Sequence, residues 1–328
     1  MPIPIALLVD DGAPVNLMHF HDPPYPHDLL MPNSLARDFA GLCDRYGVRG
    51  KFSVLPMPGG LGAIDETLNR MPPRHLERFL EIVRAWIAPR FDITPEILTH
   101  LAAYRLTGGF HHVYEDEWVA RATVEEMTDY FALALEILRD VGLPANGMTS
   151  PWSTGIRNEA DYARAIGAAQ WRVHRRYRTW YFLHCLGGKT PRAPSVTCRN
   201  PETGQVVVSI PATTKDPFWD TQRPMSSTLR AGRAVARAGV DALLAPGRKA
   251  GRIPDVIASG CPVTLLTHWQ SLHSDGTCAG LWGLELLLAR LKKHYGDDLE
   301  WVTCSELAER TRRRQIRTAR TTSSAPVP

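Results

Sequence analysis

Carboxylates and imidazoles follow apolar segments of this chain at several points. Asp10 and Asp11 end the apolar run at 3–11, and His100 and His268 close two later apolar segments. Adjacent residues of a strand point to opposite faces, so one aspartate could hold a metal while the other handles a proton. Asp11-Gly12 is also a turn signal, and the dipeptide alone supports a turn or helix-cap role equally well.

The segments that would position these residues alternate between strands and helices. Hydrophobic patterns predict strands at 3–11, 51–55, within 91–100, and at 147–151, 170–174, 180–184, 206–210, 263–266 and 300–303. They predict helices at 34–47, 74–87, 123–141, from 158, at 229–244 and 281–295, and from 305. This order of strand, polar loop and helix predicts an α/β fold with a parallel sheet.

Right-handed crossovers would bring the ends of these strands to one face of the sheet. The residues expected to converge there are Asp10, Asp11, His100, Pro151, Trp152, His174 and His268. Active sites of α/β barrels lie at this face, so the series of polar strand ends predicts a functional site.

Composition places the chain among soluble globular proteins. The 328 residues could form one α/β barrel or two smaller domains. Much of the net charge of +4 comes from 310–320, so the nearly neutral body does not indicate a nucleic-acid partner. We expect residues 311–328 to be a basic, disordered tail.

Targeting signals and cysteine usage favour a cytoplasmic protein. The N-terminus lacks the pattern of a signal peptide, no run is long enough to span a membrane, and the six cysteines are scattered without a CxxC pair. We therefore expect reduced thiols and no membrane partner, and we leave open whether the chain forms a homo-oligomer.

Four short motifs resemble those of the NodB-homology polysaccharide deacetylases. They are Asp10-Asp11, the segment GVRGKFSVLP at 47–56, Ser150-Pro151-Trp152, and Leu266-Thr267-His268. The resemblance spreads over residues 3 to 310. It implies a distorted (β/α)7-type barrel with parallel strands, formed by a single domain over residues 1–310. It also implies a divalent metal cofactor, usually zinc.

The resemblance assigns roles to four residues. Asp10 would be the general base, Asp11 and His100 would be metal ligands, and His268 would be the general acid. The family has two histidines four residues apart at its second motif, whereas His100 is followed by Tyr104 at that spacing. Zinc normally has three protein ligands, so another must exist. The candidates for the third ligand are His19, His21, His111, His112 and His268 itself. The arginine of the family's third motif is replaced by Ser150.

Candidate substrate-binding residues lie near the strand ends. Trp152, Trp219 and Trp269 could stack on sugar rings, although tryptophans are more often part of a core. Lys215 could contact the substrate, and it could equally form a surface salt bridge with Asp216, which could also orient a site residue.

These observations predict a metal-dependent hydrolase that removes an acyl group from a carbohydrate or related amide. A second hypothesis is a glycoside hydrolase on the same barrel, which would need a carboxylate partner such as Asp216 or Glu115 across the site from the adjacent aspartates. A third is a carbohydrate-binding protein without catalysis, which the missing histidine motivates.

Overall fold

The computed structural model describes residues 2–21, 27–184, 190–223, 228–247 and 249–323, apart from the side chains of His21 and 317–323. One sheet has the order β10 (Val263–His268), β1 (Ile3–Asp10), β2 (Gly50–Val54) and β3 (Phe91–Pro95), with all neighbours parallel. The start of β1 also pairs with β11 (Leu299–Trp301). The predicted parallel sheet is confirmed.

A second sheet continues the curvature of the first. It contains β6 (Met148–Thr149), β7 (Arg178–Leu183) and β9 (Gln205–Pro211) in parallel, with β8 (Ser195–Asn200) antiparallel to β9. β4 (Ala102–Tyr104) and β5 (Phe110–Tyr114) form a separate antiparallel hairpin. The β8–β9 hairpin turns at 201–204, as its PETG sequence predicts.

Two seams join these sheets into a distorted barrel. Glu96 and Thr149 form a parallel bridge between the ends of β3 and β6. On the other side, the backbone N–H of Thr213 donates to Oγ1 of Thr264 and the backbone N–H of Thr264 donates to Oγ1 of Thr213, each at 2.8 Å. The predicted (β/α)7-type barrel is therefore confirmed. Its strands are β1, β2, β3, β6, β7, β9 and β10.

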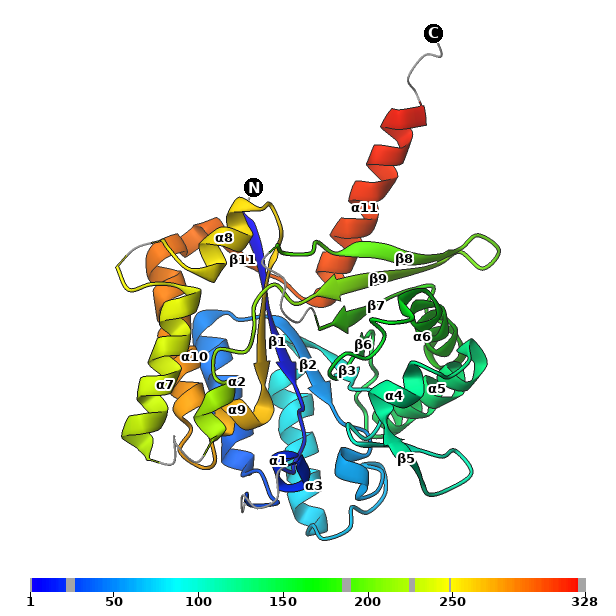
Figure 1. The fold of residues 1–328 in the computed structure, drawn as a ribbon, viewed down its shortest axis with the longest axis horizontal. Coiled ribbons are helices and arrows are strands. Elements are labelled where there is room, and N and C mark those ends of the chain that lie inside the picture. Colours follow the sequence, from blue (N-terminus) through cyan, green and yellow to red (C-terminus); the bar gives the residue numbers. More distant parts are fainter. Residues whose placement is uncertain (1, 22–26, 185–189, 224–227, 248, 324–328) are drawn as a thin grey trace.

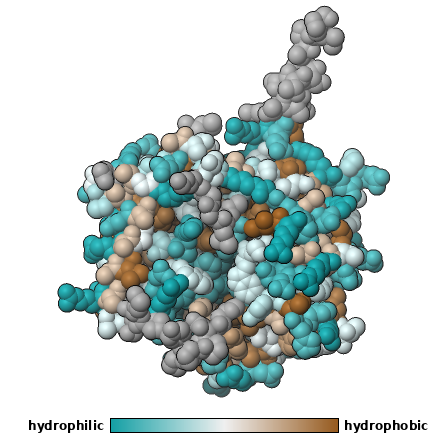
Figure 2. All heavy atoms as spheres, in the orientation of Figure 1, coloured by the Kyte–Doolittle hydropathy of each residue, from teal (hydrophilic) through white to brown (hydrophobic). Residues whose placement is uncertain are grey.

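Helices cover the outside of the barrel (Figure 1). They are α1 (Met18–His21), α2 (Asn33–Tyr46), α3 (Pro73–Ile82), α4 (Glu115–Val119), α5 (Val124–Asp140), α6 (Glu159–His174), α7 (Leu229–Leu243), α8 (Arg252–Ala258), α9 (Trp269–His273), α10 (Ala279–Tyr295) and α11 (Cys304–Ser323). A π-helical turn at Val83–Ile87 extends α3, and 3-10 turns lie at Pro58–Gly60, Trp219–Gln222 and Gly296–Asp298. None of the helices within the described ranges is long and apolar enough to cross a membrane. On the face drawn in Figure 2, hydrophobic residues are scattered among hydrophilic ones.

Alternation along β1 divides the core into two parts. Ile5, Leu7 and Val9 pack outward against the helices, whereas Ala6 and Leu8 face the barrel interior. The interior cluster also contains Trp180, Phe182, Ile210 and Leu266 from the other strands, and Cys304, Leu307 and Ala308 of α11, which close the N-terminal end of the barrel. Asp10 continues the inward-facing series of β1.

Three local predictions differ from the structure. Residues 170–174 are the last turn of α6 and not a strand, because Ile166 and Ala169 belong to a buried helical face that ends only at Arg175, which is left-handed. His174 therefore ends a helix. Helix α2 begins at Asn33, one residue before the predicted start at 34, and it has no side-chain cap at Pro32. Helix α11 continues to Ser323, through most of the segment for which we expected disorder.

Candidate active site

Asp10 is the last residue of β1 and is fully buried. Its Oδ1 forms an ion pair with Nζ of Lys51, which is also fully buried and comes from the inward face of β2. Nζ of Lys51 also donates to the carbonyl of Val9 at 3.2 Å and to Oγ1 of Thr149 at 2.9 Å. Burial raises the pKa of Asp10, but Lys51 and the hydrogen bond from His184 outweigh burial and keep this pKa below its ordinary value.

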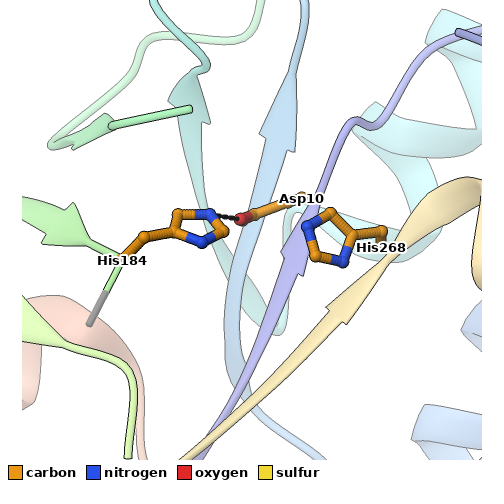
Figure 3. A group of neighbouring side chains, drawn as sticks. All are labelled: Asp10, His184 and His268. Carbon is orange, nitrogen blue, oxygen red and sulfur yellow. Dashed lines mark hydrogen bonds and ion pairs between the residues drawn. The ribbon is translucent and has the colours of Figure 1, made fainter. Parts of the chain in front are cut away.

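His184 follows β7 directly and reaches the other oxygen of Asp10. Its Nε2 lies 2.7 Å from Oδ2 of Asp10 (Figure 3). Because Asp10 is a carboxylate, Nε2 of His184 must carry the hydrogen of this bond. Burial lowers the pKa of His184, and the opposing effect of Asp10 is smaller. His184 is therefore a neutral imidazole near neutral pH.

His268 ends β10 on the opposite side of Asp10, to which it is paired in register (Figure 3). Its Nδ1 lies 2.9 Å from Oδ2 of Asp216, which also accepts bonds from the backbone N–H of His268 at 3.0 Å and from Oγ of Ser271 at 2.6 Å. Burial lowers the pKa of His268, but Asp216 and Asp11 raise it to about 9. His268 is therefore protonated at neutral pH, and Asp216 has the orienting position that we considered for it.

Asp11 belongs to a second cluster, because the chain turns there into the left-handed region with φ of 61°. The backbone N–H of Asp11 donates to Oε2 of Glu96 at 2.6 Å, and Oγ of Ser53 donates to the same oxygen at 2.6 Å. Oδ1 of Asp11 and Oε1 of Glu96 are buried without a hydrogen-bond partner among the described residues. They face Nε2 of His100, at 2.9 Å and 3.5 Å respectively.

His100 is held by the loop that follows β3. Its φ is 61°, and the buried carboxylate of Glu115 accepts bonds from the backbone N–H groups of Thr99 and His100, at 2.8 and 2.7 Å. The ring of Trp152 packs edge-on against the imidazole, with centroids 4.5 Å apart. Glu115, which we considered as a glycosidase carboxylate, thus fixes a loop.

The charges of this second cluster are mutually dependent. Burial raises the pKa of Glu96 to about 8, and Asp11 and Asp10 add to this effect. Burial lowers the pKa of His100, but Asp11 outweighs burial and the pKa rises to about 10. A cation in the position that the His100 proton occupies would be attracted by the same two carboxylates.

The second cluster fits a divalent cation. Each of Asp11, Glu96 and His100 offers one ligand atom, and these atoms all lie within 4.8 Å of one another. Two oxygens without hydrogen-bond donors and an imidazole nitrogen are a donor set that Zn²⁺ and Mn²⁺ accept. Asp10, His184 and His268 are equally close together, but Lys51 already places a positive charge on Asp10 and disfavours a cation there.

A cavity of about 540 Å³ opens beside both clusters. Its lining includes Asp11, His100, His184 and His268 of the two clusters, whereas Asp10 and Glu96 lie behind it. Of the predicted substrate-binding residues, the ones that line the cavity are Trp152, Lys215 and Trp219. Trp219 also packs edge-on against His268, with centroids 4.8 Å apart.

Trp269 does not line the cavity, and its predicted role in substrate binding is wrong. It is almost fully buried and packs edge-on against Phe39 and Phe52. The reason is local: α9 starts directly after β10 and turns the indole outward, into the core between strands and helices.

The loop histidines lie apart from both clusters. Nδ1 of His19 contacts the carbonyl of His27 at 2.8 Å, His111 packs against Trp118, and His112 lies in the β5 hairpin. The side chain of His21 is outside the described residues. Glu96 lies with Asp11 and His100 where we expected a histidine as the third ligand.

Three residues of the site were missed in the sequence, although each left a signal there. Glu96 precedes His100 by four residues, the spacing of the family's histidine pair, whereas at that spacing we considered only Tyr104, which follows His100. His184 ends a predicted strand, as the other site residues do. Lys51 is the charged residue of a buried strand whose other residues are uncharged, and a lysine in such a place requires a buried partner.

Comparisons with known proteins gave matches among solved structures. No protein-family model and no curated protein matches the chain. Among solved structures, a chitin deacetylase from the fungal pathogen Colletotrichum lindemuthianum is 11% identical, with a TM-score of 0.44 over 94% of this chain and 88% of that one. A mutant of a CE4 family pseudoenzyme with restored enzymatic activity is 10% identical, with a TM-score of 0.42 over 94% of this chain and 72% of that one. A 4-alpha-glucanotransferase from Thermococcus litoralis is 12% identical, with a TM-score of 0.46 over 93% and 40%.

At these identities and TM-scores the likeness carries no argument about function, and we argue the function below from the residues of this chain. The solved structures that the chain matches thus include a chitin deacetylase and a mutant of a CE4 family pseudoenzyme.

Proposed function

We propose that this protein is a metal-dependent hydrolase that removes an acyl group from an amide of a carbohydrate or a related small molecule. One observation carries the proposal: a buried triad of Asp11, Glu96 and His100 shares a cavity with the His268–Asp216 pair. A divalent ion at the triad would lower the pKa of a bound water and polarise the carbonyl of the substrate. Zinc is the ion to test first, and the second carboxylate extends the choice to manganese.

His268 is placed to act as the general acid. Asp216 holds Nδ1, so Nε2 is the nitrogen that can donate into the cavity. Because the pKa of His268 is raised to about 9, the ring is protonated at neutral pH and can give a proton to the leaving nitrogen. Without that proton the amine would leave as an anion, which is a far poorer leaving group.

The walls of the cavity suit a ring-shaped substrate. Trp152 and Trp219 offer aromatic surface beside the triad and beside His268, respectively. Aromatic side chains of this kind pack against the apolar faces of sugar rings. Lys215 is exposed at the lining and can donate hydrogen bonds to substrate oxygens.

The glycosidase hypothesis is less well supported. A glycosidase needs a protonated carboxylic acid in the cavity, across from a second carboxylate. Asp11 lines the cavity, but His100 holds its pKa below the ordinary value despite the burial that raises it. Asp216 is engaged with His268, and Glu96, whose pKa is raised to about 8, lies behind the lining.

The test is metal content together with turnover. The chain is stripped with a chelator, reloaded with zinc or manganese, and assayed on N-acetylglucosamine oligomers and on a chromogenic acetate ester. We expect about one ion per chain, and we expect Glu96→Gln to lose it together with activity. Asp216→Asn serves as the matched control, because it should keep the ion and lose most of the turnover. Absence of bound metal in the unmodified chain would overturn the proposal, and sugar binding without metal or turnover would favour a binding protein.

A further inference from the structure

Asp10, the residue that the resemblance makes the general base, has no contact with the cavity. Its side chain is fully buried, with Oδ1 in an ion pair with Lys51 and Oδ2 bound to His184. Both oxygens are therefore occupied by donors, and neither faces the space in which a substrate would lie.

His184 does line this cavity, in contact with Asp10 behind it. Since Nε2 carries the hydrogen that goes to Asp10, Nδ1 of the neutral ring bears a lone pair. No hydrogen bond to Nδ1 exists among the described residues, and Nδ1 is not among the buried polar atoms that lack a partner. The lone pair is thus available to a molecule in the cavity.

His184 and His268 form a complementary pair, with ring centroids 5.8 Å apart. A carboxylate holds Nε2 of His184, and another carboxylate holds Nδ1 of His268. Environments that separate two similar groups in this way mark the base and the acid of a reaction. Burial lowers the pKa of His184, Asp10 opposes this effect, and the charges of His268 and Lys51 add to it. The pKa of His268, in contrast, is raised to about 9.

We propose that Nδ1 of His184 is the proton acceptor of the hydrolysis and that Asp10 is its positioning residue. This inference rests on the proposed function. A buried carboxylate that fixes the tautomer and orientation of an imidazole base is a general arrangement in hydrolases. The ion pair with Lys51 holds Oδ1 of Asp10, so that Oδ2 faces Nε2 of His184 and Nδ1 of the ring is left to face the cavity.

The proton transfers balance over the two steps. A water oxygen bonds to the carbonyl carbon, one water proton passes to Nδ1 of His184, and the π pair moves to the carbonyl oxygen. When the C–N bond breaks, a pair on the oxyanion re-forms the C=O bond, and the C–N pair stays on nitrogen, which takes the proton of Nε2 of His268. His184 then returns its proton to solvent and His268 takes one up, so that water and amide become carboxylic acid and amine.

The kinetic test uses two substitutions at one position. In His184→Gln the side-chain amide can still donate to Asp10 but offers no basic nitrogen, and His184→Ala leaves space for added imidazole. We expect His184→Gln to lower kcat at least about 100-fold with KM and metal content unchanged, and we expect imidazole to restore turnover of His184→Ala. The control is His174→Gln, because His174 is another histidine with a lowered pKa but lies outside the cavity. Full activity of His184→Gln would overturn the inference.

A second measurement does not depend on finding a substrate. Nitrogen-15 NMR of the imidazoles, assigned with His184→Gln and His268→Gln, reports which ring nitrogens carry hydrogen in the metal-loaded chain at pH 7. We expect hydrogen on Nε2 alone for His184 and on both nitrogens for His268. Hydrogen on Nδ1 of His184 would overturn the inference. Failure of the unmodified chain to hydrolyse any acyl substrate would count against the proposed function, and the NMR result would still decide the state of His184.

Discussion

Two clusters begin at adjacent aspartates and differ in what balances their charge. Asp10 is balanced by Lys51, a cation that the fold itself supplies, and by two imidazoles. Asp11 lies with a second carboxylate, Glu96, and has His100 as its only cationic neighbour in that group. The chain separates the two by leaving β1 at Asp11 in a left-handed conformation.

This difference separates two kinds of chemistry. The Asp10 cluster has a complete set of charges and is suited to moving protons between imidazoles and a substrate. The Asp11 cluster is short of positive charge when His100 is neutral, and it is suited to binding a cation. If the comparison holds, substitutions in the Asp10 cluster should leave cation binding intact, and substitutions in the Asp11 cluster should leave the proton-transfer groups intact.

The largest contrast is expected between the adjacent aspartates. Asp11→Asn should weaken metal binding by more than about 100-fold, because even the loss of an outer partner of a ligand has an effect of up to that size. Asp10→Asn should keep the metal and lose turnover, because His184 would no longer be held in the reactive tautomer. Isothermal titration with zinc and turnover assays measure both. Equal metal loss in the two variants would break the comparison.

Removal of the built-in cation should affect stability most. Lys51→Met leaves the carboxylate of Asp10 buried without its ion pair, and we expect a loss of about 3 to 5 kcal/mol in the free energy of unfolding. Lys51→Met combined with Asp10→Asn should recover part of this loss, because no buried charge then remains. Urea denaturation measures these values. Lys215→Met, at an exposed lysine, is the control and should change stability by less than about 0.5 kcal/mol.

His268, which belongs to the Asp10 cluster, should make the stability of the fold depend on pH. The pKa of His268 is raised from 6.5 to about 9 in the folded chain, so its protonation favours folding. The contribution, on the order of 3 kcal/mol, should be fully present below pH 6.5 and lost as pH rises through 9. The difference in unfolding free energy between the metal-free chain and His268→Gln should shrink over this range. A difference that does not vary with pH would contradict the assigned charge.

The smallest effects are expected at the two tryptophans. Trp152 packs against His100 of the Asp11 cluster, and Trp219 packs against His268 of the Asp10 cluster. Trp152→Ala should weaken metal binding about 2- to 10-fold, the value of one aromatic contact, whereas Trp219→Ala should raise KM by a similar factor without affecting the metal. Direct titrations of metal and substrate with each variant distinguish these effects.

Much of the barrel follows from local patterns in the sequence. β1 is a largely apolar run, and Thr123 and Glu126 have the spacing of a capping box, which is present at the start of α5. Such features depend on neighbouring residues, so the sequence reveals them. The predicted strand at 170–174 failed because short apolar segments fit a buried helical turn equally well.

The site itself depends on contacts between distant segments. Asp10, Asp11, His100 and His268 were named from their positions after strands, and the structure brings them together beside one cavity, whose lining Asp10 does not reach. The partnership of Lys51 with Asp10 spans two strands and was not visible from either. His100 meets Glu96 across a loop with left-handed residues at Ile97 and His100, a backbone conformation that the sequence does not reveal.

The first turns of α11 give the C-terminal segment an influence on the distant reaction. Cys304, Leu307 and Ala308 are buried side chains of the interior cluster and lie at the N-terminal end of the barrel, opposite Lys51 and Asp10. Water admitted there would raise the local dielectric constant and weaken the attraction between Lys51 and Asp10. The strength of the ion pair between Lys51 and Asp10 therefore depends on apolar side chains of α11 at the opposite end of the barrel.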